Sequence, residues 1–222
     1  MKRVAAFSVM LAIAGLVPAA VAEEFTTAQV LAKLDEKAKV FTSLQASLKN
    51  VGYNYGASTG EQTGKLFISK TKDTPRVLMD ITEPRKQRVL IDKGKGTLYY
   101  PDDNTYRERK VDEKGEAVQY LLIGFGASSD TISKGYKAEA KGREMIGGVN
   151  AVVLELSSIA KSTADYPILK LWLDPQTWTP VQTRVGQNAK NYNDYKYSNV
   201  QLNKSVSDSV FDLKMKPGAK KQ

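Results

Sequence analysis

The sequence predicts a mainly β, α+β protein: a strongly curved antiparallel sheet with helices packed on its concave face. Apolar and polar residues alternate in about ten short runs, and turn residues separate these runs at short intervals. After the first 22 residues, only two segments have helical or continuous apolar patterns. A long twisted sheet curls and must bury one face, so the two helices are expected to cover that face.

The first 22 residues have the parts of a cleavable secretory signal peptide. Met1-Lys2-Arg3 is a short basic start, Val4 to Val17 is an apolar run, and Ala20-Val21-Ala22 is a small-x-small site. The apolar run is shorter than the ~20 residues of a membrane-spanning helix. We therefore expect export with cleavage after Ala22, and one domain over residues 23–222 with a short basic C-terminal tail.

Composition excludes several kinds of catalysis. The chain has neither Cys nor His, which rules out a Ser-His-Asp triad, a thiol nucleophile, a disulfide framework and the usual zinc site. Asp102-Asp103 and Asp112-Glu113 lie in polar turns, and no spacing ties them to a second acidic group. Asp102-Asp103-Asn104 lacks the register of a calcium loop. We expect no enzyme, no metal and no cofactor.

The exported chain is basic. The full chain has 33 basic and 24 acidic residues, and removal of Lys2 and Arg3 leaves a net charge of +7. An exported basic protein meets anionic membrane surfaces, glycans or acidic proteins sooner than nucleic acid, so no nucleic-acid partner is expected. The basic residues are scattered apart from one cluster, interpreted as a solvated tail, at Lys214, Lys216, Lys220 and Lys221.

The predicted elements begin with a helix from Thr26 to Phe41. Thr26 or Thr27 can cap it, Gln29 can complete a capping box, and Val30, Leu31, Leu34, Ala38 and Phe41 share one face. Turn residues such as those at 56–60, 92–96 and 101–104 favour hairpins. The strands are predicted at 44–55, 65–70, 77–81, 89–91, 97–100, 105–110, 136–143, 149–157, 168–173, 179–185 and 192–203.

Two irregularities interrupt this pattern. Residues 117–125 are almost continuously apolar and are bracketed by glycines, which predicts a short helix that is either core or a movable lid. In the last strand the apolar phase slips after Tyr197, which predicts a bulge near Ser198 and Asn199. A short turn at 206–211 leads to the tail.

A curved sheet that its helices fill only partly leaves an apolar space lined by alternate strand residues. Such a space suits a hydrophobic ligand. A completely filled core gives the same sequence pattern, so periodicity leaves both alternatives open.

The order of several segments resembles the LolA-like outer-membrane lipoprotein carrier family. After the amphipathic first helix come residues 64–70, Met79 to Pro84, Leu90-Ile91-Asp92 and Thr97 to Pro101, followed by the apolar helix at 119–123. Residues 171–175, 179–181 and 197–203, Phe211 and Pro217-Gly218 complete the order. The resemblance covers most of the chain after the signal.

This resemblance implies an incomplete antiparallel β-barrel in the periplasm, covered by helices, that shelters the acyl chains of lipoproteins or another acyl lipid. It implies a monomer that meets an inner-membrane release complex and an outer-membrane receptor. The implied cavity residues are Leu34, Val77, Met79, Ile81, Val89, Leu121 and Leu122, with Leu66, Ile68, Leu98 and Tyr100 as weaker candidates.

The sequence departs from the family between the strands that contain Leu66 and Val77. The family's arginine in this turn is not matched, and Lys70, Lys72 and Arg76 are the nearby basic residues. The lid could therefore be held differently. An alternative function is a periplasmic domain of the same fold that binds or senses a protein partner, or another lipid, without transport.

Overall fold

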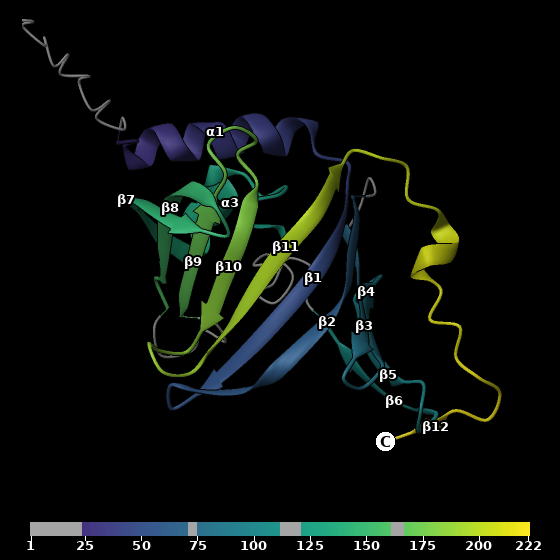
Figure 1. Cartoon of the computed structure of the whole chain (residues 1–222). Coiled ribbons are helices and arrows are strands. Elements are labelled where there is room, and N and C mark those ends of the chain that lie inside the picture. Colours follow the sequence, from purple (N-terminus) through teal and green to yellow (C-terminus); the bar gives the residue numbers. More distant parts are fainter. Residues whose placement is uncertain (1–23, 71–74, 112–120, 161–166) are drawn as a thin grey trace, which may run out of the picture.

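The computed structural model describes residues 24–70, 75–111, 121–160 and 167–222 (Figure 1). The predicted signal peptide and the first four residues of the predicted helix at 117–125 lie outside these residues. Two helices, one short 3₁₀ helix and twelve strands are described: α1 (Thr27–Val40), β1 (Ser43–Asn54), β2 (Ala57–Lys70), β3 (Pro75–Glu83), β4 (Gln87–Asp92), β5 (Lys95–Tyr100), β6 (Thr105–Lys110), α3 (Ser129–Gly135), β7 (Tyr136–Ile146), β8 (Val149–Ser158), β9 (Ile168–Leu173), β10 (Pro180–Gly186), β11 (Tyr192–Leu202), η1 (Asp208–Phe211) and β12 (Lys220–Lys221).

All twelve strands form one sheet in the order β12-β6-β5-β4-β3-β2-β1-β11-β10-β9-β8-β7. Neighbouring strands are antiparallel except β12, which pairs parallel to β6. Strand β1 joins a first arm, β2 to β6, to a second arm, β7 to β11, and the sheet curls without closing (Figure 1). The predicted fold class, a curved and mainly antiparallel sheet with helices, is confirmed.

Helix α1 forms where the sequence predicts it and covers the second arm. Thr26 caps it, because its hydroxyl accepts from the N–H of Gln29 while the Gln29 side chain accepts from the N–H of Thr26. Val30 and Leu34 point into a second-arm core that lies on one face of β8, β9 and β10. This core comprises Val30, Leu34, Ile123, Ala127, Ile132, Tyr136, Val152, Leu154, Leu156, Leu169, Leu171, Leu173, Trp178 and Val185.

A first-arm core lies on the same concave face. It comprises Phe41, Leu44, Ala46, Leu48, Leu66, Ile68, Val77, Ile81, Ile91, Val111, Leu121 and Phe125. Leu122 and Tyr195 pack against both cores, so the apolar surface is continuous from one arm to the other.

The predicted helix at 117–125 ends earlier than expected, because helical conformation stops at Leu122 and residues 123–126 form turns. Gly124 has a φ of +88°, a conformation that favours glycine. A Cβ at Gly124 would lie 2.5 Å from Cγ of Pro180 and 2.7 Å from Cδ2 of Leu171. The turn therefore brings the backbone closer to the sheet than a helix with side chains could come.

Three further differences concern polar segments. The hairpin between β1 and β2 turns at Tyr55 and Gly56, so the predicted loop at 56–60 is mostly strand. Helix α3 was not predicted, because its seven residues include only one large apolar side chain, the buried Ile132. The predicted bulge is confirmed: one extra residue of β11 lies opposite β1 between Ser198 and Gln201.

The segment after β11 forms an outer layer on the convex face of the first arm. Phe211 and Leu213 pack against Leu78 and Tyr99, and Arg88 donates hydrogen bonds to the carbonyls of residues 210, 212 and 213. The segment ends at β12 beside β6 (Figure 1). The lysines of the predicted solvated tail are exposed, but the backbone of two of them, Lys220 and Lys221, is paired with β6.

Candidate binding pocket

Two rows of side chains cross the concave face of the first arm from strand to strand. In the first row the paired residues are Ala46, Leu66, Met79, Val89, Leu98 and Arg107. In the second row they are Leu44, Ile68, Val77, Ile91, Gly96 and Arg109. Directly paired residues of an antiparallel sheet lie on the same face. Each row is thus apolar or small until β6, where it ends in an arginine.

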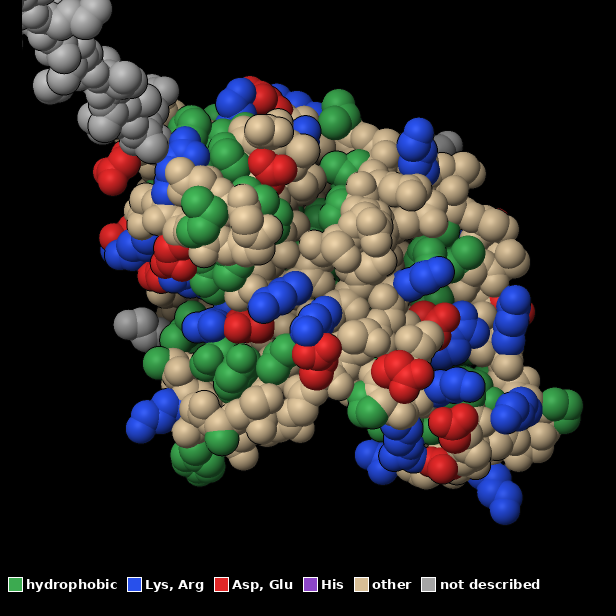
Figure 2. Space-filling view, viewed as in Figure 1, with side chains coloured by type: hydrophobic (Ala, Val, Ile, Leu, Met, Phe, Trp, Pro, Cys, Tyr) green, Lys and Arg blue, Asp and Glu red, His purple; other side chains and the backbone are tan. Residues whose placement is uncertain are grey.

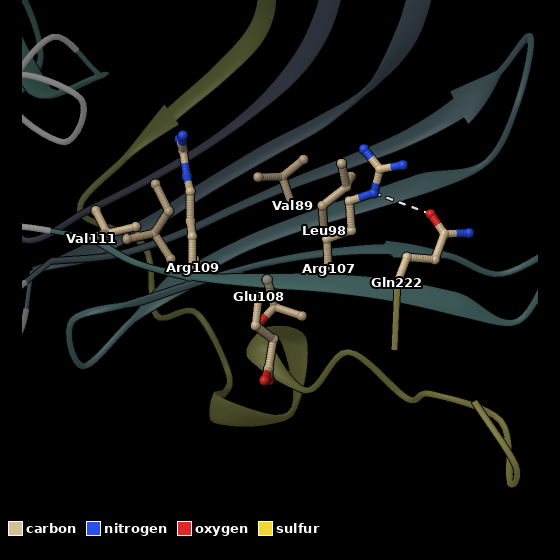
Figure 3. A pocket seen from close by; sticks show the side chains of 10 residues that line it. Val89, Leu98, Arg107, Glu108, Arg109, Val111 and Gln222 are labelled. Carbon is tan, nitrogen blue, oxygen red and sulfur yellow. Dashed lines mark hydrogen bonds between the residues drawn. The ribbon is translucent and has the colours of Figure 1, made fainter. Parts of the chain in front are cut away.

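Burial decreases along these rows towards β6. Leu44, Ile68 and Val77 are fully buried, whereas Val89 and Leu98 are only partly buried. A pocket of about 540 Å³ lies over this end, lined by Val89, Ile91, Gly96, Thr97, Leu98, Arg107, Glu108, Arg109, Val111 and Gln222 (Figure 3). Its volume is within the usual range for small-molecule sites, about 300–1,000 Å³.

Gly96 leaves room in this pocket because it has no side chain. A Cβ at Gly96 would lie 2.7 Å from Cγ2 of Val111 and 3.6 Å from Cγ of Arg109. The missing side chain therefore lets Val111 fold over the end of the second row and lets the stem of Arg109 cross the strand. Leu98, in the neighbouring row, contributes an apolar side chain to the lining of the pocket.

A second, more polar pocket of about 490 Å³ lies where α1 meets the segment before α3. The carboxylate of Asp35 accepts hydrogen bonds of 2.6 Å from both the backbone N–H and the hydroxyl of Ser129. These bonds, above all the one from the hydroxyl, hold the pKa of Asp35 below its usual value. Lys39 and Lys70 also line this pocket. Its polar walls make it a poorer shelter for an acyl chain.

The structure divides the predicted cavity residues between the cores and the pocket. Val89 and the weaker candidate Leu98 line the pocket. Leu34 lies in the second-arm core, whereas Val77, Ile81, Leu121, Leu66 and Ile68 belong to the first-arm core, against which Met79 packs. Leu122 packs on both cores, and the ring of Tyr100 lies under the guanidinium of Arg85. Their part in binding stays a prediction.

Sequence reasoning missed the two arginines and Val111. The sequence did contain the information for the arginines, because the strand from Thr105 to Lys110 pairs with the apolar strand before it across one short hairpin. Continuing the inward face of β5 across one hairpin would have placed Arg107 and Arg109 on the concave side.

Comparisons with known proteins support the fold alone. No family model matches the sequence, and no curated protein matches it significantly. A solved structure of a conserved protein from Thermus thermophilus aligns with a TM-score of 0.55 at 9% identity, over 88% of this chain and 97% of that one. MucB aligns with a TM-score of 0.50 at 16% identity, over 84% of this chain and 62% of that one.

A LolA superfamily protein from Nitrosomonas europaea aligns with a TM-score of 0.40 at 16% identity, over 85% of this chain and 98% of that one. This chain shares the fold of the Thermus thermophilus protein and of MucB, a curved unclosed sheet with helices. Identities this low carry no statement about ligand or partner.

Proposed function

We propose that the chain is a periplasmic carrier that shelters the acyl chains of lipoproteins, or of a related lipid, and delivers them towards the outer membrane. The observation that carries this proposal is the pocket over β4 to β6, into which two rows of apolar side chains continue from the core. No bond is made or broken in this function. The signal-like start at residues 1–22 supports export.

The physical basis is the cost of acyl chains in water. Each buried methylene is worth ~0.8 kcal/mol, so a long acyl chain gains on the order of 10 kcal/mol in an apolar shelter. Val89, Ile91, Leu98 and Val111 provide such a surface, and the more buried residues of both rows lie behind it. The pocket is partly open to solvent, which gives a lipid a route in and out.

Release needs a part of the shelter that can move. Asp35 and Ser129 tie α1 to the segment that leads from Leu122 into α3, and Leu122 packs on both cores. A membrane partner that breaks this tie would loosen the cover of the concave face. We propose an inner-membrane release complex as donor and an outer-membrane receptor as acceptor, with the carrier acting as a monomer.

A second candidate is a domain that binds a protein partner. The edge of β6 favours it, because β12 pairs only with Thr105 and Tyr106. Within the described chain, residues 107–110 therefore have one unpaired backbone edge, which could accept an added strand.

Lipid extraction and dye binding separate the two candidates. Protein exported to a bacterial periplasm and purified without detergent should release stoichiometric acyl lipid or lipoprotein on organic extraction, identified by mass spectrometry. The delipidated protein should bind a fluorescent fatty-acid probe. A carrier predicts both results, whereas extraction without lipid together with failure to bind the probe would favour the protein-binding domain.

A matched pair of variants locates the site. Leu98→Glu places a charge on the pocket floor and should weaken probe binding more than tenfold. Met145→Glu makes the same kind of change at an exposed position of β7, at the other edge of the sheet, and should bind like the unchanged protein. Circular dichroism should show that both variants keep the sheet. Equal binding by both variants would place the lipid elsewhere.

A further inference from the structure

The two arginines of β6 lie on the same side of the sheet as the apolar floor of the pocket. Figure 3 shows Arg107 and Arg109 projecting to the side of Val89, Leu98 and Val111, whereas Glu108 projects to the opposite side. The cross-strand pairs give the same result, since Arg107 lies opposite Leu98 and Arg109 lies opposite Gly96. Both positive charges thus border an apolar surface.

The acidic residues of this region form ion pairs on the convex face of the sheet. Glu108 pairs there with Lys95 and Lys221, at 2.9 and 3.1 Å, and Arg88 lies 3.4 Å from Asp80. Figure 2 shows basic and acidic side chains interspersed over the strands of the first arm and the C-terminal segment. The charges of the convex face therefore compensate one another.

On the concave face, the residues that the structure describes provide no such compensation. Among the residues that the structure describes, no carboxylate forms an ion pair with Arg107 or Arg109. Nε of Arg107 donates to the side-chain oxygen of Gln222 at 3.1 Å, which positions the guanidinium, and its terminal N–H groups have no partner among the described residues. Arg109 has no hydrogen-bond partner in the described part of the chain. Two exposed guanidinium groups thus stand at the rim of the pocket.

The spacing of these groups suits one anion. Residues i and i+2 of a strand are about 7 Å apart along the chain, and two long flexible side chains can converge from that distance. Guanidinium groups bind phosphate oxygens through paired, charge-assisted hydrogen bonds. A single phosphate can accept bonds from both side chains while the rest of its molecule continues onto the apolar floor.

We propose that the pocket takes an acyl lipid with a phosphate-bearing, anionic headgroup. Arg107 and Arg109 hold the phosphate, and the acyl chain lies along the two rows, over Leu98 and Val89 of the first row and Ile91 of the second. This rests on the proposed function and narrows its cargo. An amphiphile fits this site better than an acidic peptide does, because the surface that leads away from the two arginines is apolar and offers a peptide backbone no polar partners.

The test compares monoacyl lipids that share one acyl chain and differ in headgroup. Delipidated, exported protein is titrated with lysophosphatidic acid, lysophosphatidylcholine and monoacylglycerol below their critical micelle concentrations, in competition with the fatty-acid probe. The lipid with the anionic phosphate should bind at least tenfold more tightly than monoacylglycerol, and this preference should shrink as salt increases.

Variants assign the preference to the two arginines. Arg107→Gln and Arg109→Gln should each lower the affinity for lysophosphatidic acid by three- to tenfold and leave the affinity for monoacylglycerol unchanged. Lys110→Gln removes the same charge from the same strand, but on the opposite, convex face, and should change neither affinity. Arg109→Lys keeps the positive charge but loses the planar guanidinium, so its affinity for lysophosphatidic acid should lie between that of the unchanged protein and that of Arg109→Gln.

Each contrary result has a distinct meaning. Equal affinity for all three lipids would overturn the phosphate proposal and leave the carrier function standing, whereas binding of none of them would overturn both. Inorganic phosphate that binds as tightly as lysophosphatidic acid would mean a simple anion site. If the arginine variants lose binding to anionic phospholipid vesicles but not to monomeric lipid, the arginines serve a membrane surface and the pocket proposal fails.

Discussion

The carboxylate of Asp35 on α1 receives two hydrogen bonds from Ser129, one from its N–H and one from its hydroxyl, each 2.6 Å long. Ser129 is the first residue of α3, and the segment before it leads back to Leu122. This pair therefore joins the opening helix to the part of the chain that covers both cores.

Replacement of Asp35 should loosen that connection. Hydrogen bonds to a charged group are worth about 1.5–3 kcal/mol each when buried, and this carboxylate is partly exposed, so we expect Asp35→Ala to lower the free energy of unfolding by about 1–2 kcal/mol. Glu36→Ala is the control, because Glu36 forms only an exposed pair with Lys33 on the same helix. Urea titrations that give the same midpoint for both variants would contradict this role.

The same pair predicts a dependence on pH. The hydrogen bonds from Ser129 lower the pKa of Asp35 from its ordinary value of 3.8. A lowered pKa in the folded state stabilises the fold above the unfolded value and loses this contribution as pH falls through the folded value. Asp35→Asn should therefore be less stable than the unchanged protein at pH 7, and the difference should shrink below about pH 4. A constant difference down to pH 2 would exclude this titration.

Replacing Gly124 should lower the stability of the fold for two reasons, its backbone conformation and the lack of space for a side chain. Gly124 and Gly148 both have positive φ values, but a Cβ at Gly148 would meet nothing within 4 Å. Gly148→Ala should thus cost only the backbone strain, about 1 kcal/mol. Gly124→Ala adds contact with Pro180 and Leu171 and should cost a further 1–3 kcal/mol or so. Thermal unfolding of both variants measures the difference, and equal costs would mean that the turn has room.

The outer layer of the first arm should contribute to stability. Phe211 is buried against Leu78 and Tyr99, and Phe211→Ala should lower the free energy of unfolding by about 3 kcal/mol. Met215→Ala, at a position with 41% of its surface exposed, is the control and should cost less than about 1 kcal/mol. If Phe211→Ala has no larger effect than the control, the C-terminal segment is not part of the folded body.

The alternation of residues predicted most of the sheet because burial acts on it directly. Val77, Met79 and Ile81 point to one face, whereas Leu78 and Asp80 point to the other, and only strand geometry gives this period. The slip of this period at Ser198 and Asn199 likewise predicted the bulge. Elements held mainly by backbone pairing left weaker signals: the outer half of the β1–β2 hairpin and the two residues of β12 have little apolar pattern.

The site was less predictable than the fold. An inward apolar residue has the same pattern whether it is packed, as Ile68 is, or faces open space, as Leu98 does. The difference depends on where helices happen to cover the sheet, and α1 covers the second arm through Val30 and Leu34. The alternation of apolar and polar residues does not indicate which part of the sheet a helix covers.

The strand order also has a consequence for biogenesis. The pocket lies in the first arm, which residues 57–110 form, but the convex face of this arm is covered by residues 203–222, and its neighbour across β1 is β11. During synthesis, the N-terminal part emerges first. The pocket-bearing arm therefore emerges with apolar surface uncovered on both sides, and its convex face stays uncovered until the last twenty residues of the chain have been made.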